Sequence, residues 1–112
     1  MLFLTYWELN EQIPYDERMR IAKRMTESGV FPPKDVKIIR WDSTPDGWGI
    51  TLCEAKNVED ITRAINLWRA AAPAFFKFTR TAPAAPARDA IKQGIAIANE
   101  MKGVDLSLIS HN

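Results

Sequence analysis

Short apolar runs and amphipathic stretches alternate along most of the chain. Strands are expected where apolar and aromatic residues cluster, and helices where apolar residues recur every three or four positions with charges between them. The run LFLTYWEL at residues 2–9 is apolar on both parities, which is typical of a strand buried on both faces. On these criteria the sequence predicts strands over residues 2–9, 36–42, 48–55 and 74–81, and helices over residues 15–28, 58–72 and 88–102.

Turn and capping residues mark where several of these elements end. Residues 44–47, TPDG, have proline second and glycine fourth, a combination typical of a type I turn. The strands on either side of this turn are therefore expected to form a hairpin. Asn57 is placed to cap the second helix, and Gly103 to end the third. The tail, residues 104–112, alternates apolar and polar residues and is expected either to add to a sheet edge or to fray.

The order strand, helix, strand, strand, helix, strand is that of the ferredoxin-like split unit. It predicts an α+β fold, with an antiparallel four-stranded sheet, two helices on one face and an extra C-terminal helix. The fold covers residues 1–83, and residues 84–112 form a linker, helix and tail of the same single domain, as a length of 112 residues favours. Because the strands are apolar on both parities, the second face should be covered. A homodimer that stacks two sheets or closes them into a barrel would cover it.

Several short motifs, in this order, resemble those of the dimeric α+β barrel superfamily and, within it, a family of short proteins classed as a domain of unknown function. They are FPP at 31–33, RWD at 40–42, Gly49, EA at 54–55, Trp68 and Pro83. The resemblance spans about residues 1–83 and leaves out the third helix and the tail. It implies a ferredoxin-like fold and a homodimer. It implies no single reaction, because the relatives include cofactor-free monooxygenases, haem-degrading enzymes, polyketide cyclases, isomerases and non-enzymatic ligand binders.

Charge and hydropathy narrow the range of partners. The 15 basic and 14 acidic residues are interleaved, and no basic stripe of the kind that binds nucleic acid is present. No apolar run approaches the ~20 residues of a membrane helix, and the first residues lack the features of a signal peptide. The single cysteine, Cys53, suits a reducing compartment. We therefore expect a cytoplasmic protein with neither a nucleic-acid nor a membrane partner.

Residue types that hold cofactors are scarce. The single histidine, His111, lies in the tail, so an axial haem ligand or a zinc cluster is disfavoured. Gly47 and Gly49 lie in the predicted hairpin rather than before a helix, so they do not form a phosphate-binding loop. Cys53 has no histidine beside it and is expected to be an inert buried thiol. We expect no metal and no organic cofactor.

The predicted hairpin register selects a candidate site. If residues 44–47 form a four-residue loop, Ser43 lies opposite Trp48, and directly opposed residues share a face. One face then carries Lys37, Ile39, Trp41, Ile50, Leu52 and Glu54. This face is expected to look into the barrel interior, because it combines a large aromatic ring with a carboxylate. The opposite face packs under the helices and carries Val36, Ile38, Arg40, Thr51, Cys53 and Ala55. A one-residue bulge would reverse the faces of one strand.

On the first strand, Thr5 and Trp7 have the more pocket-like parity, and Leu2 and Leu4 the more core-like one. For the fourth strand, the sequence leaves open which alternate set faces the pocket: Phe75, Lys77 and Thr79, or Phe76, Phe78 and Arg80. The predicted ligand-binding residues are Thr5, Trp7, Ile39, Trp41, Ile50 and Leu52, and the candidate catalytic residue is Glu54. Two of these residues have a structural alternative: Trp41 could fill the core, and Glu54 could only pair with Lys37. Trp68, which is not among them, is expected to pack between helix and sheet.

Three classes of function stay open. The first is a homodimeric binding module that holds a small hydrophobic or aromatic molecule in its barrel cavity. The alternative is a cofactor-independent monooxygenase, cyclase or isomerase that acts on an aromatic or polyketide-like substrate. In that enzyme Glu54 takes a proton while Trp7, Trp41, Tyr6 or Arg40 positions the ring. The third is an assembly protein whose third helix and tail contact a partner.

Overall fold

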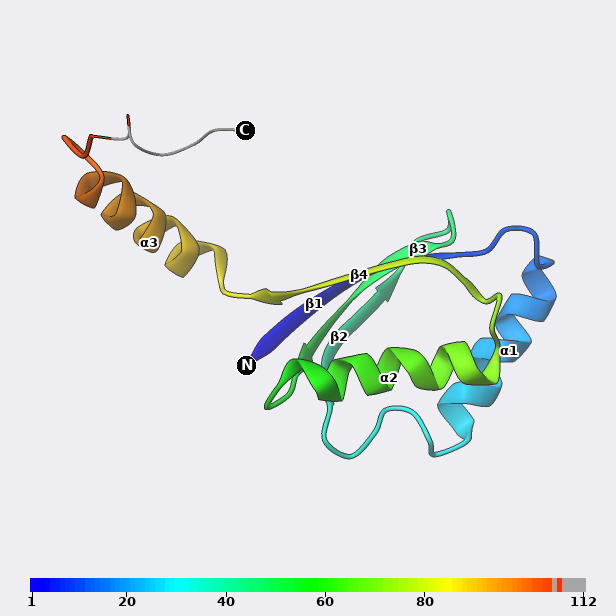
Figure 1. Ribbon diagram of the computed structural model, residues 1–112. Helices are drawn as coiled ribbons and strands as arrows, with labels where there is room; N and C mark the ends of the chain where they lie inside the picture. The colour runs from blue at the N-terminus through cyan, green and yellow to red at the C-terminus, as the bar shows by residue number, and fades with distance from the viewer. Residues whose placement is uncertain (106, 108–112) are drawn as a thin grey trace.

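The computed structural model describes residues 1–105 and 107, and it confirms the ferredoxin-like order with an extra C-terminal helix. A four-stranded antiparallel sheet has the strand order β2-β3-β1-β4. Helices α1 and α2 cover one face of this sheet (Figure 1). The elements are β1 (Leu2–Leu9), α1 (Tyr15–Glu27), β2 (Lys37–Ser43), β3 (Trp48–Glu54), α2 (Val58–Ala71), β4 (Phe76–Ala84) and α3 (Ala87–Glu100). The predictions for His111 and for most of the tail concern residues outside those described.

The predicted turn and cap are confirmed. In the hairpin turn, the Thr44 amide donates to the Trp48 carbonyl at 2.8 Å, and Gly47 has a φ of 77°. That left-handed conformation carries little cost for glycine, which has no Cβ. At the start of α2, the side chain of Asn57 accepts a hydrogen bond from the Asp60 amide at 3.1 Å. This contact satisfies one of the N–H groups that the first helical turn leaves free.

A β-bulge in β2 makes the predicted hairpin register wrong. Trp41 pairs with Thr51 instead of Ile50, because the register shifts by one residue between Ile38 and Arg40. An extra residue in one strand reverses the face that each following side chain uses. Trp41 therefore turns toward the helices together with Thr51. The shift also separates Trp41 from the group of β3 residues with which it was predicted to share a face.

The core lies on the helix side of the sheet, in two groups of buried side chains. One group contains Phe3, Val36, Cys53, Ala55, Ile61 and Ala64. The other contains Trp7, Leu9, Met25, Trp68 and Phe75. Trp68 is 3% exposed, which confirms the expectation that it lies between helix and sheet. Burial is thus concentrated on the face that α1 and α2 cover.

The opposite side of the sheet, called the open face below, has no helix over it in Figure 1. Three of its apolar side chains, Leu4, Ile50 and Phe78, are 41%, 38% and 46% exposed. Tyr6 lies among them, with its ring centroid 6.2 Å from that of Phe78 and 5.9 Å from that of Trp48. The sheet is therefore apolar on both faces, as the sequence predicts, while a single chain covers only one.

Helix α3 stands apart from the rest of the fold (Figure 1). None of its residues is buried, and Ile91 and Ile95 are 62% and 59% exposed. The Cα radius of gyration is 18.6 Å, against about 13 Å expected for a compact chain of this length. A lone helix of 14 residues is marginally stable in water. The apolar side of α3 therefore has no packing surface within the part of the chain that the structure describes.

Candidate functional site

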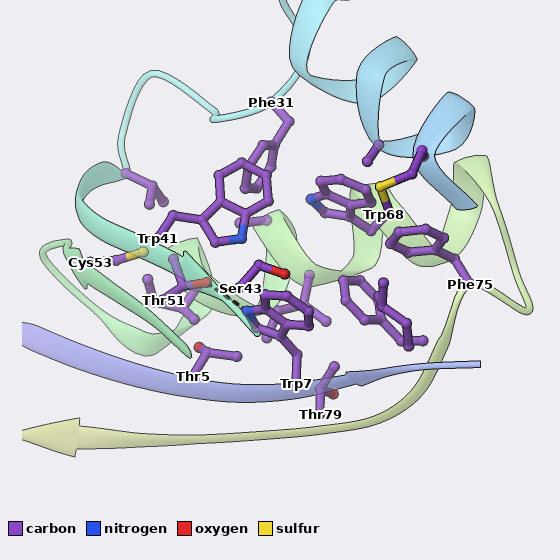
Figure 2. A pocket seen from close by; sticks show the side chains of 18 residues that line it. Thr5, Trp7, Phe31, Trp41, Ser43, Thr51, Cys53, Trp68, Phe75 and Thr79 are labelled. Atoms are coloured by element: carbon purple, nitrogen blue, oxygen red, sulfur yellow. Dashed lines mark hydrogen bonds between the residues drawn. The ribbon is translucent and has the colours of Figure 1, made fainter. Parts of the chain in front are cut away.

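An apolar cavity of about 310 Å³ lies between the helices and the sheet (Figure 2). Trp41 and Ser43, both on the edge strand β2, line the cavity and are also exposed, so its mouth lies beside this strand. Six aromatic side chains line it: Trp7, Phe31, Trp41, Trp68, Phe75 and Phe76. Four hydroxyl-bearing side chains also line it: Thr5, Ser43, Thr51 and Thr79.

The aromatic rings form one connected wall. Phe31, Trp41 and Trp68 meet edge to face, with centroids 5.4 Å (Phe31–Trp41), 5.2 Å (Phe31–Trp68) and 5.9 Å (Trp41–Trp68) apart. Trp68 also stacks on Phe75 at 5.2 Å with an interplanar angle of 18°. Edge-to-face and stacked rings attract one another beyond simple burial. The wall is therefore held in place by contacts among its own members.

A row of hydroxyl groups, called the threonine row below, crosses the sheet, and two of its three members lie at the floor of the cavity. Thr51, Thr5 and Thr81 are register neighbours on β3, β1 and β4. The hydroxyl oxygens of Thr5 and Thr81 lie 2.8 Å apart in a shared hydrogen bond. Thr5 and Thr51 are 8% and 9% exposed, and they are the buried polar side chains among the described residues. The sheet thus places polar groups beneath a largely apolar space.

Trp7 lies across this floor, and its position depends on Gly49. The indole Nε1 of Trp7 donates a hydrogen bond to Oγ1 of Thr51 at 3.0 Å (Figure 2). Gly49 is the register neighbour of Trp7 on β3, and a Cβ at this position would collide with the Trp7 ring and with the Asp42 carbonyl. Glycine in a strand often marks such a close approach. The missing side chain at position 49 is what lets the indole lean over β3 and reach Thr51.

The lining carries no charged side chain among the described residues. Arg69, in the last turn of α2, donates to Oγ1 of Thr79 at 2.7 Å, but Arg69 itself is not part of the lining. Cys53 is buried in the cavity, and burial raises the pKa of its thiol. The thiol therefore stays protonated at neutral pH. The cavity is uncharged as well as apolar.

The predicted ligand-binding residues separate into two groups. Thr5, Trp7 and Trp41 lie together in the cavity. Ile39, Ile50 and Leu52 do not line it. Ile39 occupies the bulge, and Ile50 and Leu52 pair with Tyr6 and Leu4 on the open face. The bulge turns Trp41 away from the β3 residues that were predicted beside it. Thr5 and Trp7 are separated from Ile50 and Leu52 for another reason: β1 turns them toward the helices, the reverse of the predicted orientation of this strand.

Glu54, the candidate catalytic residue, lies outside the cavity. It is exposed at the end of β3, opposite Lys37 on one side and Leu2 on the other. No ion pair joins Glu54 to Lys37 in the described part of the chain, although the predicted pairing of the two positions is confirmed. A general base must reach the proton that it takes. Glu54 is therefore not placed to take a proton from a molecule in this cavity, and its catalytic role stays a prediction.

Sequence reasoning missed the hydroxyl-bearing residues Thr51, Thr79 and Ser43. The sequence predicts Thr51 only as packing under the helices, and it leaves the face of Thr79 open. The cross-strand register brings Thr51 and Thr79 to the cavity, since Thr5 pairs with Thr51 and Trp7 with Thr79, and the sequence alone predicts neither pairing. Ser43 reaches the cavity mouth only because of the bulge, which no motif in the sequence announces.

Comparisons with known proteins found no match: no protein-family model matches the chain, and no curated protein does. The resemblance to the dimeric α+β barrel superfamily therefore stays a prediction that rests on short motifs. Within residues 1–105 and 107, no three His, Cys, Asp or Glu side chains are grouped so that they could hold a metal ion. No helix in the same part of the chain has the length and apolar character needed to span a membrane.

Proposed function

We propose that this protein binds a small hydrophobic or aromatic molecule in the cavity between its helices and its sheet. The observation that carries the proposal is the cavity of about 310 Å³ with its wall of aromatic rings. Protein interiors are normally filled to close packing, so an open space of this size is a departure from ordinary core structure. Sites for small molecules are mostly apolar, with a few placed polar groups, and the hydroxyl groups of this lining fit that description.

The cavity volume limits the size of the molecule. An apolar cavity of about 150 Å³ accommodates benzene. A cavity of about 310 Å³ therefore has room for a molecule of about two fused rings. Its mouth beside Trp41 lets such a molecule enter without unfolding of the sheet.

We also propose that a second copy of the chain covers the open face. The support is the apolar surface of Leu4, Ile50 and Phe78, which lie on the central and outer strands of that face. Contiguous exposed apolar surface on a protein usually marks an interaction site. A homodimer of this kind would leave the cavity free, because the cavity lies on the opposite side of the sheet.

A cavity-filling substitution tests the binding proposal. Ala64 is buried on α2 and lines the cavity, so the side chain introduced by Ala64→Phe would occupy the space of the ligand. Isothermal titration calorimetry with 2-acetylnaphthalene should show binding to the wild type and at least tenfold weaker binding to Ala64→Phe. Because the added ring enters empty space, the melting temperature should stay within about 5 °C of the wild type.

The matched control is Ala70→Phe, an exposed position on the same helix, which should bind like the wild type. Equal affinities of the wild type and Ala64→Phe would refute the proposed site. A wild type that binds no naphthyl compound would refute the proposed function.

A further inference from the structure

The threonine row holds a hydroxyl proton that has no acceptor in the described part of the chain. Oγ1 of Thr51 accepts the indole N–H of Trp7. A threonine hydroxyl has one proton to donate in addition to its lone pairs. No hydrogen bond donated by Thr51 is found among the described residues, and its side chain is buried at the cavity floor. A buried donor without a partner costs free energy, so this proton is best satisfied by a molecule in the cavity.

Thr5 can supply a second proton at the same level of the floor. It shares one hydrogen bond with Thr81, in which either oxygen can be the donor. When Thr81 donates, Thr5 keeps its own proton for another acceptor. Thr5 lines the cavity directly beside Thr51, while Thr81 is not part of the lining. Thr51 and Thr5 can therefore donate one or two hydrogen bonds to a ligand, depending on which hydroxyl donates in the Thr5–Thr81 bond.

The charge of the lining restricts the ligand further. Transfer of an ion into an apolar site without a counter-charge is strongly unfavourable. Arg69 holds Thr79 from outside the lining, and the Cys53 thiol is neutral. The cavity thus favours a neutral molecule over a carboxylate, a phosphate or an amine.

We propose that the ligand is an uncharged, flat molecule of about two fused aromatic rings that carries a carbonyl-type oxygen, and that this oxygen accepts the hydroxyl proton of Thr51. This inference rests on the proposed function. The rings lie against the wall of Phe31, Trp41 and Trp68, where aromatic edges and faces are available. The oxygen points to the floor, where it satisfies the buried proton.

Two nearly isosteric probes and a charged one test the inference by calorimetry. They are 2-acetylnaphthalene, 2-isopropylnaphthalene and 2-naphthoate. The substitution Thr51→Val keeps the shape of the side chain and removes its hydroxyl. It should weaken the ketone about three- to tenfold, the range expected for one neutral hydrogen bond, and leave the hydrocarbon unchanged. The affinities of the ketone and the hydrocarbon are compared in the wild type and in Thr51→Val. The difference between the two changes in binding free energy does not depend on the hydration of either probe, or on a change in Trp7 that affects both probes equally.

Two further variants keep the test independent of folding. Thr51→Ser retains a hydroxyl and should keep the ketone affinity within about twofold of the wild type. Thr62→Val removes an exposed hydroxyl on α2 and should alter neither affinity.

Each contrary result overturns a different part of the inference. If Thr51→Val weakens ketone and hydrocarbon equally, or weakens neither, Thr51 is not the donor, and the binding site itself stands. If 2-naphthoate binds tightest, the ligand is not neutral. If none of the probes binds the wild type, the proposed function fails, and this inference fails with it.

Discussion

The two faces of one sheet share an apolar composition and differ in what they contact. On the helix side, Phe3 and Trp7 are 1% and 7% exposed, whereas Leu4 and Phe78 on the open face are 41% and 46% exposed. The helix side also contains the cavity, which lies above Thr5 and Thr51 of the threonine row. Apolar strand residues therefore identify a sheet but not a ligand site. The site arises where helices span a part of the sheet that its own side chains do not fill.

The largest expected contrast is between two tryptophans, one on each face. Trp68→Ala should lower the free energy of unfolding by about 4 kcal/mol, because it removes a buried ring that contacts Phe31, Trp41 and Phe75. Trp48→Ala, at a 40% exposed position on the open face, should cost under about 1 kcal/mol. Urea unfolding followed by circular dichroism measures both. Equal costs for the two would contradict the distinction between the faces.

Gly49→Ala should lower the free energy of unfolding by about 2–3 kcal/mol, because the new Cβ collides with Trp7 and with the backbone. The same substitution at Gly94 of α3 meets no atom within 4 Å. Gly94→Ala should instead raise the helix content of α3, with no loss of stability. Thermal unfolding of the two variants gives the comparison. A neutral Gly49→Ala would show that the indole does not lie over this glycine.

Phe78→Asp places a charge among the apolar side chains of the open face, on the edge strand β4, and should weaken a homodimer at least tenfold, or about 1.4 kcal/mol. Native mass spectrometry over a range of concentrations would show a shift from dimer to monomer. Ligand affinity should not change, because Phe78 does not line the cavity. Ile91→Asp makes the same kind of change on α3. Comparing the dimer affinities of the two variants separates the contribution of the helix to the dimer from that of the open face. A wild type that is monomeric at all concentrations would rule out the second copy.

The smallest expected effect is a pH dependence that comes from Cys53. Burial raises the pKa of this thiol above its ordinary value of 9.0 in the folded protein. As pH rises through about 9, the unfolded chain releases a proton that the folded chain retains, so the folded state becomes relatively less stable. The wild type should therefore lose stability between about pH 8 and pH 10 relative to Cys53→Ala. Below this range the difference in the free energy of unfolding between the two proteins should be constant. If the stabilities of the two proteins changed with pH in parallel over the whole range, the raised thiol pKa would be contradicted.

The sequence predicted the fold well because its signals are local. Asn57 caps a helix and residues 44–47 form a turn through contacts within a few residues, and the apolar periodicity of each segment sets its type. The order of the segments then leaves few arrangements of the sheet. Thr5, Trp7 and Trp41 do line a cavity, but on the other side of the sheet from the predicted barrel interior. The predicted orientation of the first strand is wrong, since Thr5 and Trp7 are buried on the helix side and Leu4, expected in the core, is exposed on the open face.

The rest of the site depends on a single non-local feature. The extra residue at Ile39 decides which face Trp41 and Ser43 use, and a bulge has no clear signature in one sequence. The sequence predicts Trp41 in the barrel interior, whereas Trp41 lies with Thr51 on the helix side. Glu54 keeps its predicted pairing with Lys37, which precedes the bulge, and it lies on the face of β3 that points away from the cavity. The position of α3, none of whose residues is buried, is likewise not specified by local sequence patterns.

The four tryptophans give the most direct test of whether ligand binds on the helix side. Trp7, Trp41 and Trp68 line the cavity, and Trp48 lies on the open face. In ¹⁵N-labelled protein each indole N–H gives its own NMR signal, which single Trp→Phe variants assign. Titration with 2-acetylnaphthalene should shift the signals of Trp7, Trp41 and Trp68 and leave that of Trp48 in place. A shift confined to Trp48, or no shift in any of the four, would contradict a ligand site between the helices and the sheet.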